Sequence, residues 1–215
     1  MGIIIRQGIK TTIVNFIGAF VGMISVLFIY PLEKEIVGFA NNLYSMASFL
    51  TPFIGIGSAS IAIKFYYKLK TENEKSPAGF LVSILIYILI TLISFLLLSY
   101  LCKEYFYAFL LKLNFDSSIF SENELSIVIM STLLVTISVF TVFSQIKGRS
   151  TVPSIITNFC YKLFLPSLVI LFFFKKIKEV NVDLYVVGFH TAALIILAIY
   201  IYQFHVFNFN KNGFK

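Results

Sequence analysis

Charged residues are scarce in this sequence. Only 13% of its 215 residues are Asp, Glu, Lys or Arg, whereas 59% are hydrophobic. A soluble domain of this size carries about 25% charged residues. The composition therefore excludes a soluble fold and leaves no room for a separate soluble domain. It predicts an all-α integral membrane protein, for which the lipid bilayer is both solvent and partner.

Cysteine is nearly absent as well. Cys102 and Cys160 lie far apart and have no His or Asp neighbours at ligand spacing. This pattern excludes a disulfide framework and a metal site, and we expect no cofactor. The sequence also lacks the motifs of serine hydrolases, zinc proteases and nucleotide-binding loops, so we expect no enzyme.

Acidic residues are missing from the apolar runs. All ten Asp and Glu residues fall in loops or at the ends of these runs. A carboxylate-based site for proton or sodium coupling is therefore not expected. His190 lies inside the last apolar run without an acidic partner, which favours packing over a proton relay.

Six apolar runs are long enough to cross a membrane, which takes about 20 residues. They predict spans at residues 11–30, 41–63, 78–101, 125–145, 151–174 and 184–202. The first run is too long for the apolar part of a cleaved signal peptide, so we expect it to remain as a span. The six spans predict a single membrane domain over residues 1–215.

The basic residues indicate orientation. Of the 17 Lys and Arg residues, ten fall on the inner side and six on the outer side when the N-terminus is placed in the cytoplasm. The positive-inside rule then puts both termini in the cytoplasm. This topology explains the net charge of +7. We expect no nucleic-acid binding, because no basic patch alternates with aromatics outside the spans.

The longest outer loop, residues 102–124, is not plainly polar. Phe106, Phe109, Leu110 and Leu113 recur in it at helical spacing between two lysines. This pattern predicts a short helix on the outer membrane surface. Extension of the third span is the alternative.

Lys162 is the remaining cation, and it lies near the middle of the run 151–174. A charge at bilayer depth costs roughly 3 kcal/mol on insertion scales. About 11 residues at 1.5 Å each place it ~17 Å from the start of the span. We therefore interpret Lys162 as facing a protein interior or a water-filled path. Snorkelling to the headgroups is the alternative.

Two prolines lie within spans. Pro52 and Pro166 each lack the amide that would bond the carbonyl four residues earlier, at Ser48 and at Lys162. They predict hinges of the kind found in broken transporter helices, or else ordinary kinks.

Small and polar residues mark helix contacts. Gly18-x-x-x-Gly22 and the patch at residues 55–60 predict close helix packing, with a hinge as the alternative. Asn15, Asn158 and Gln145 are polar within spans and are expected to face inward. There they would bond other helices or contact a substrate.

Several segments together carry a resemblance to a known family. They are residues 1–18 (MGIIIRQGIKTTIVNFIG), 32–38 (LEKEIVG), 53–66 (FIGIGSASIAIKFY), 147–154 (KGRSTVPS) and 158–162 (NFCYK). In this order and spacing they resemble the polysaccharide biosynthesis proteins. These are oligosaccharide flippases of the multidrug/oligosaccharidyl-lipid/polysaccharide exporter superfamily. The resemblance covers essentially the whole chain and is closest to lipopolysaccharide-type (O-antigen) members.

The resemblance implies one six-helix lobe of a two-lobe transporter in the bacterial inner membrane. The substrate would be an oligosaccharide linked to an isoprenoid diphosphate. Lys162 would hold the diphosphate, Asn15 and Asn158 would bond sugar hydroxyls, and Pro52 and Pro166 would let the helices bend. Because this chain holds six spans, a second lobe or a second copy would be its partner.

Two other functions remain open at this point. One is a small-molecule exporter of the same superfamily, which predicts acidic residues inside the spans. The other is a non-transporting scaffold of a glycan assembly complex, which predicts that Lys162 faces lipid or snorkels.

Overall fold

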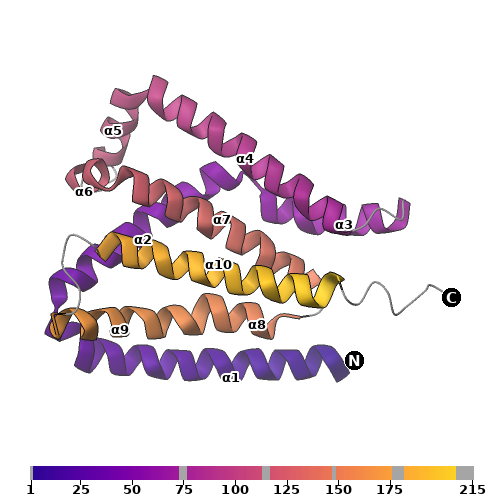
Figure 1. Cartoon of the computed structure of the whole chain (residues 1–215), viewed down its shortest axis with the longest axis horizontal. Helices are drawn as coiled ribbons and strands as arrows, with labels where there is room; N and C mark the ends of the chain where they lie inside the picture. The colour runs from indigo at the N-terminus through magenta and orange to yellow at the C-terminus, as the bar shows by residue number, and fades with distance from the viewer. Residues whose placement is uncertain (1, 73–76, 113–116, 147–148, 176–181, 207–215) are drawn as a thin grey trace. The chain divides into compact units, whose positions relative to one another are not determined.

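Helices make up every regular element in the part of the chain that the computed structural model describes (Figure 1). The described residues are 2–72, 77–112, 117–146, 149–175 and 182–206. The prediction of an all-α fold is confirmed. In chain order the elements are α1 (Gly2–Ile24), the π-helical η1 (Ser25–Ile29), the 3-10 helix η2 (Tyr30–Leu32), α2 (Lys34–Gly55), α3 (Ser58–Glu72), α4 (Pro77–Leu101), α5 (Lys103–Lys112), α6 (Ser117–Glu122), α7 (Glu124–Ile146), α8 (Thr151–Ser154), the π-helical η3 (Ile155–Phe159), α9 (Cys160–Phe173) and α10 (Val182–Val206).

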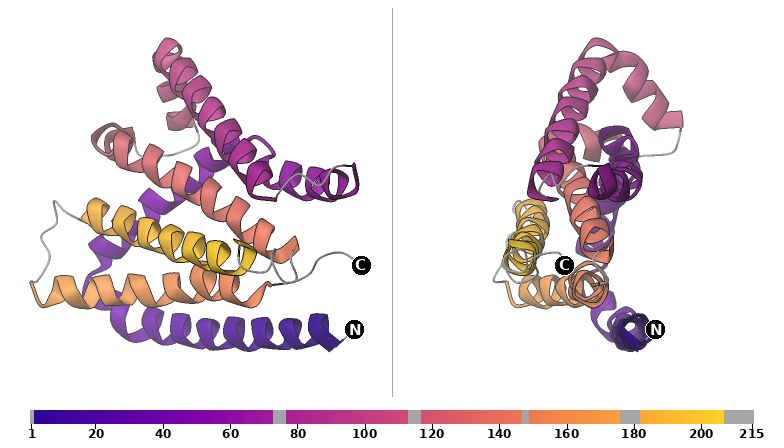
Figure 2. Two further views of the ribbon diagram at one scale, coloured as in Figure 1. Left: turned by 45° about the vertical axis from the view of Figure 1, so that its right-hand side comes forward. Right: turned by 90° about the vertical axis from the view of Figure 1, so that its right-hand side faces the viewer.

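The chain forms two compact units. The first comprises Met1–Asn41 and Phe140–Lys215, and the second comprises Asn42–Val139. In the first unit, α1 runs beside α8, η3 and α9, as both views of Figure 2 show. In the second unit, α3 packs against α4. The predicted site residues Asn15, Asn158, Lys162 and Pro166 belong to the first unit, whereas Pro52 belongs to the second.

The protein is a multi-pass membrane protein. Five helical stretches in the described residues have the length and apolarity of membrane spans. These are Ile5–Leu32, Leu81–Leu101, Glu124–Ile146, Thr151–Phe173 and Val182–Gln203. A sixth span is present only if the bent pair Lys34–Gly55 and Ser58–Tyr66 crosses as one. Five of the six predicted spans therefore have a counterpart in these stretches, and the prediction at residues 41–63 falls on the bent pair.

The bent pair differs from the single span expected at residues 41–63. α2 ends at Gly55, α3 begins at Ser58, and the two helices meet at an angle of 46°. Gly57 has a φ of +69°, a left-handed conformation that glycine adopts at little cost. Pro52 lies inside α2, so the helix continues past it and the break follows at the glycines. The hinge predicted at Pro52 stays a prediction.

Side chains from α4 bond the carbonyls at this break. The Thr91 hydroxyl donates to Ile54 O at 2.6 Å, and the Tyr87 hydroxyl donates to Ile56 O at 2.9 Å. At membrane depth no water is available to donate hydrogen bonds to the carbonyls at a helix end. Each carbonyl left without a hydrogen bond there would cost several kcal/mol. The two hydroxyls therefore allow the span to break within an apolar environment.

The loop at residues 102–124 contains a separate helix, as predicted. A turn at Cys102 ends α4, and α5 begins at Lys103. The Phe109 ring lies 6.3 Å from the ring of Phe49 in α2. Leu113 of the predicted pattern lies outside the described residues, and the placement of α5 on the membrane surface stays a prediction.

We expect Gly55→Ala to destabilise the second unit. An added Cβ would lie only 3.1 and 3.2 Å from the two γ-methyl groups of Val135. Overpacking of this kind costs about 1–3 kcal/mol. Thermal unfolding in detergent should show a lower midpoint, and adding Val135→Ala should restore part of the loss.

Gly38→Ala provides the matched control on the same helix. No heavy atom lies within 4 Å of the Cβ position at Gly38, so this variant should be neutral or slightly more stable. Equal effects of the two substitutions would contradict the packing explanation.

A polar seam between α1 and α8–α9 as the candidate functional site

Polar and small residues recur every three or four positions along two apolar helical stretches of the first unit. We call the face on which they meet the polar seam. Its residues are Gln7, Thr11, Asn15, Gly18 and Gly22 of α1, and Ser150, Thr151, Ser154, Asn158 and Lys162 at and within α8, η3 and α9. This spacing places each set on one side of its helix.

Hydrogen bonds tie the two stretches together at the N-terminal end of α1. The Thr151 hydroxyl donates to Gln7 Oε1, and the hydroxyls of Thr11 and Ser150 lie 3.4 Å apart. These four residues were not among the predicted site residues. Their recurrence at helical spacing within apolar runs was the signal that could have found them.

Ser154 joins the two asparagines that the sequence analysis selected. Its hydroxyl donates to Asn15 Oδ1 at 3.3 Å and accepts from Asn158 Nδ2 at 3.4 Å. Asn15 and Asn158 therefore face each other across the seam, and both are exposed. Among the described residues, the amide nitrogen of Asn15 and the amide oxygen of Asn158 have no protein partner. These atoms can bond a ligand.

Lys162 crosses the two glycines of α1. Its Cδ lies 3.4 Å from the Cβ position at Gly18 and 3.8 Å from that at Gly22. Its Nζ lies 3.8 Å from the Cβ position at Gly18 and is not within 4 Å of that at Gly22. The ammonium group is therefore directed toward the Gly18 side of the seam, where Asn15 lies one turn away.

The charge of Lys162 has no protein counterion in the part of the chain that the structure describes. Lys162 is half-buried and forms neither a hydrogen bond nor an ion pair with any described residue. The close packing predicted at Gly18 and Gly22 is present, but the lysine stem fills the space above the glycines. A side chain without a partner at this position is free to bind an anion.

A π-helical turn aligns the lysine with the asparagine. In a regular α-helix, a residue four positions on lies about 40° past a full turn, so Ser154, Asn158 and Lys162 would drift around the helix. The segment η3 (Ile155–Phe159) takes one more residue per turn and so reduces that drift. The seam thereby stays on one face from α8 into α9.

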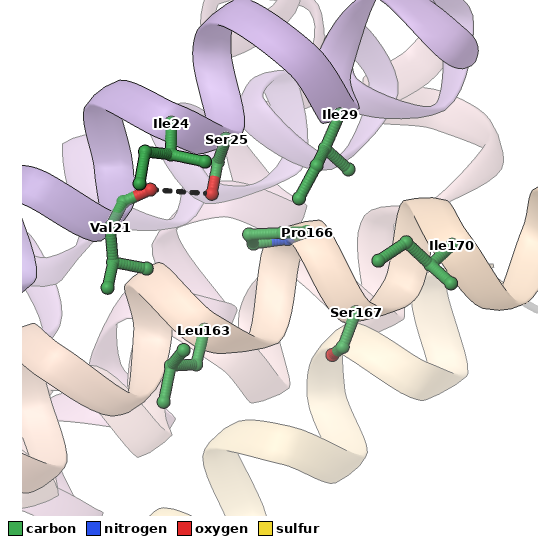
Figure 3. A pocket seen from close by; sticks show the side chains of 8 residues that line it. All are labelled: Val21, Ile24, Ser25, Ile29, Leu163, Pro166, Ser167 and Ile170. Carbon is green, nitrogen blue, oxygen red and sulfur yellow. Dashed lines mark hydrogen bonds between the residues drawn. The ribbon is translucent and has the colours of Figure 1, made fainter.

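An apolar cavity of about 310 Å³ lies along the same two helices, beginning at Leu163 next to Lys162. Figure 3 shows the side chains that line it. The cavity lies where the π-helical η1 faces Pro166, which is buried inside α9. α9 continues past Pro166 to Phe173, and the hinge predicted there stays a prediction. The cavity is lined by residues that include Val21, Ser25, Ile29, Leu163, Pro166 and Ile170.

Other predicted polar residues lie outside the seam. His190 is buried in α10, where its Nδ1 donates to Val186 O at 2.8 Å and its ring packs against Tyr161 and Phe189. Gln145 is exposed near the end of α7. Cys102 and Cys160 are free thiols, and the described residues contain no group of three His, Cys, Asp or Glu side chains that could hold a metal ion.

Comparison of the chain with protein-family models, with curated proteins and with solved structures gives no match. The family resemblance stated from the sequence therefore stays a prediction. The geometry of the polar seam is the remaining indication of function.

We expect Gly18 to tolerate alanine but not leucine. An alanine Cβ would lie 3.4 Å from Lys162 Cδ, an ordinary contact, whereas leucine would occupy the volume of the lysine stem. Gly18→Leu should cost about 1–3 kcal/mol by overpacking and should lower the thermal midpoint. Lys162→Ala should relieve this loss in the double variant.

Gly8→Leu on the same helix is the control, because nothing lies within 4 Å of the Cβ position at Gly8. If Lys162→Ala failed to rescue Gly18→Leu, the lysine would not be the group that fills this space.

Proposed function

We propose that this chain forms one lobe of a transporter that moves a lipid-linked oligosaccharide across the bacterial inner membrane for polysaccharide or lipopolysaccharide synthesis. The substrate class is a glycan joined to an isoprenoid diphosphate, and transport involves no covalent step. One observation carries the proposal. Asn158 and Lys162 lie one turn apart in η3 and α9, and Asn15 of α1, far from them in the sequence, lies along the same seam.

The charge of Lys162 favours an anionic ligand. A diphosphate loses hydration when it enters hydrocarbon, and pairing with an ammonium group offsets part of that cost. The half-buried lysine has no counterion among the described residues, so a bound anion would also stabilise the protein. An exporter of cations would need carboxylates in its spans, and all Asp and Glu residues lie at or beyond the ends of the apolar runs.

The two asparagines suit the sugar that follows the diphosphate. Their bonds through Ser154 restrict the rotation of both amides, and each amide keeps one unpaired polar atom among the described residues. Such neutral donors and acceptors bond hydroxyl groups without requiring a charge. Asn15 and Asn158 therefore have the chemistry to contact the glycan beside a diphosphate on Lys162.

Movement of the substrate requires helices that bend. It also requires a second protein surface that faces the polar seam, so that the two enclose the path of the substrate. Pro52 and Pro166 supply candidate bending points in α2 and α9, in line with the broken helices of transporters. A second six-helix lobe or a second copy of this chain would supply the second surface. This partner follows from the family resemblance.

We expect glycan export to depend on the charge at position 162. Lys162→Leu should reduce export by roughly tenfold to a hundredfold, the range expected when a hydrogen bond to a charged group is lost. Lys162→Arg should retain more activity than Lys162→Leu because it keeps the charge. The measurement is delivery of labelled lipid-linked glycan across the membrane of cells that express each variant at equal levels.

Lys10→Leu is the matched control, because it removes an exposed lysine charge from α1. Unchanged export by Lys162→Leu would reject the charge role. The accessibility of a thiol at position 158 separates transporter from scaffold. In a variant without Cys102 and Cys160, Asn158→Cys should react with a water-soluble thiol reagent, whereas no reaction would favour the scaffold.

A further inference from the structure

The polar seam and the apolar cavity form one gradient of polarity along the same helix pair. Hydrogen-bonded amides and hydroxyls lie at one end, followed by the Lys162 ammonium group and then by the lysine stem beside Gly22. The cavity begins at the residues adjacent in sequence to Gly22 and Lys162, which are Val21 and Leu163. The order is therefore polar, cationic and apolar within one unit of the fold.

The side chains that line the cavity are apolar, apart from two serines whose hydroxyl protons are already used in hydrogen bonds. Its two serines bond their own helices: Ser25 donates to Val21 O at 2.8 Å, and Ser167 donates to Phe164 O at 2.6 Å (Figure 3 shows the first bond). The remaining lining residues are apolar. A site of this kind excludes sugars and phosphates, and apolar cavities accept apolar ligands.

We infer that this cavity holds the first units of the substrate's isoprenoid chain. The diphosphate then lies on Lys162 and the glycan points toward Asn15 and Asn158. This inference rests on the proposed function and adds to it a binding site for the chain and a fixed direction for the substrate. Charge complementarity selects the occupant, because the cation beside the cavity requires an apolar chain that ends in an anionic group.

The volume of the cavity suits only part of an isoprenoid chain. A volume of about 310 Å³ lies at the lower end of ligand pockets and far below what a long polyprenyl chain would fill. The site therefore takes the chain next to the diphosphate, and the rest of the chain stays in the bilayer. Since the chain is already in hydrocarbon, the cavity contributes orientation and shape selection more than affinity.

Photolabelling can test this placement. The 215-residue chain in phospholipid vesicles is irradiated with a farnesyl diphosphate that carries a diazirine on its chain, and adducts are mapped by mass spectrometry. We expect adducts on Ile24, Leu163 and Ile170, which line the cavity. Excess inorganic pyrophosphate and the Lys162→Leu variant should both reduce them, because each removes the anchor of the head.

Ile170 and Leu171 form a matched pair for the cavity itself. They are adjacent in α9 and 38% and 44% exposed, but only Ile170 is among the lining residues. Ile170→Trp should reduce adducts on Ile24 and Leu163 by roughly tenfold, because the larger side chain fills the space that the isoprenoid units would occupy. Leu171→Trp should leave them unchanged. Ile24→Trp fills the cavity from α1 and should act like Ile170→Trp, and thermal unfolding of each variant checks the fold.

The remaining outcomes separate the two proposals. Adducts on outward-facing residues such as Leu171 and Ile196 that still require Lys162 would overturn the cavity site and leave the proposed function intact. Cavity adducts that are unaffected by Lys162→Leu or pyrophosphate would overturn the substrate direction and the diphosphate role together. Equal cavity labelling by a diazirine-bearing phosphatidic acid would identify a general lipid site and overturn the isoprenoid assignment.

Discussion

The contact between the stem of Lys162 and two glycines of α1 determines how the first unit can work. Any side chain larger than alanine at Gly18 would compete with the stem, which lies 3.4 Å from the Cβ position there. With glycine, the methylene groups pack against the helix and only the ammonium group needs a polar environment. The contact therefore lowers the cost of a charge within a span and fixes the direction in which the charge points.

Lack of water imposes a second constraint on both units. Hydroxyl groups of α4 bond the carbonyls at the break between α2 and α3. In the first unit, hydroxyls and amides of α1 and α8–η3 bond each other along the seam. In each case, polar groups from a neighbouring helix stand in for solvent. The irregular and polar parts of the fold are thus placed where another helix can satisfy them.

Much of the architecture could be predicted, because length and apolarity alone define a span in lipid. The bend between α2 and α3 was predicted only as an alternative. Its glycines were interpreted first as a packing patch and second as a hinge, and hydroxyls of Tyr87 and Thr91 from a different helix bond the carbonyls at the bend. The spacing of apolar residues within one segment does not show which side chains of another helix will bond its carbonyls.

Only part of the candidate site could be predicted, because some of its residues are unusual within a span and others are not. Lys162, Asn15 and Asn158 stand out because lysine and asparagine are costly within a span. Ser154 does not stand out, since serine and threonine in helices commonly bond their own backbone, as Ser25 and Thr51 do here. The two π-helical turns also have no sequence signal that we could have used, because local packing decides where an extra residue is accommodated.

The π-helical turn η3 has a consequence for how this segment tolerates change in length. A turn that already contains an extra residue can lose one and become a regular helix, with the helix on either side keeping its face. A one-residue deletion between Cys160 and Lys162 would fall in regular α-helix, which has no extra residue to lose. It would turn the ammonium group about 100° around the helix axis. Among one-residue deletions in the α8–α9 segment, those within residues 155–159 that keep Asn158 should therefore disturb the helix on either side least.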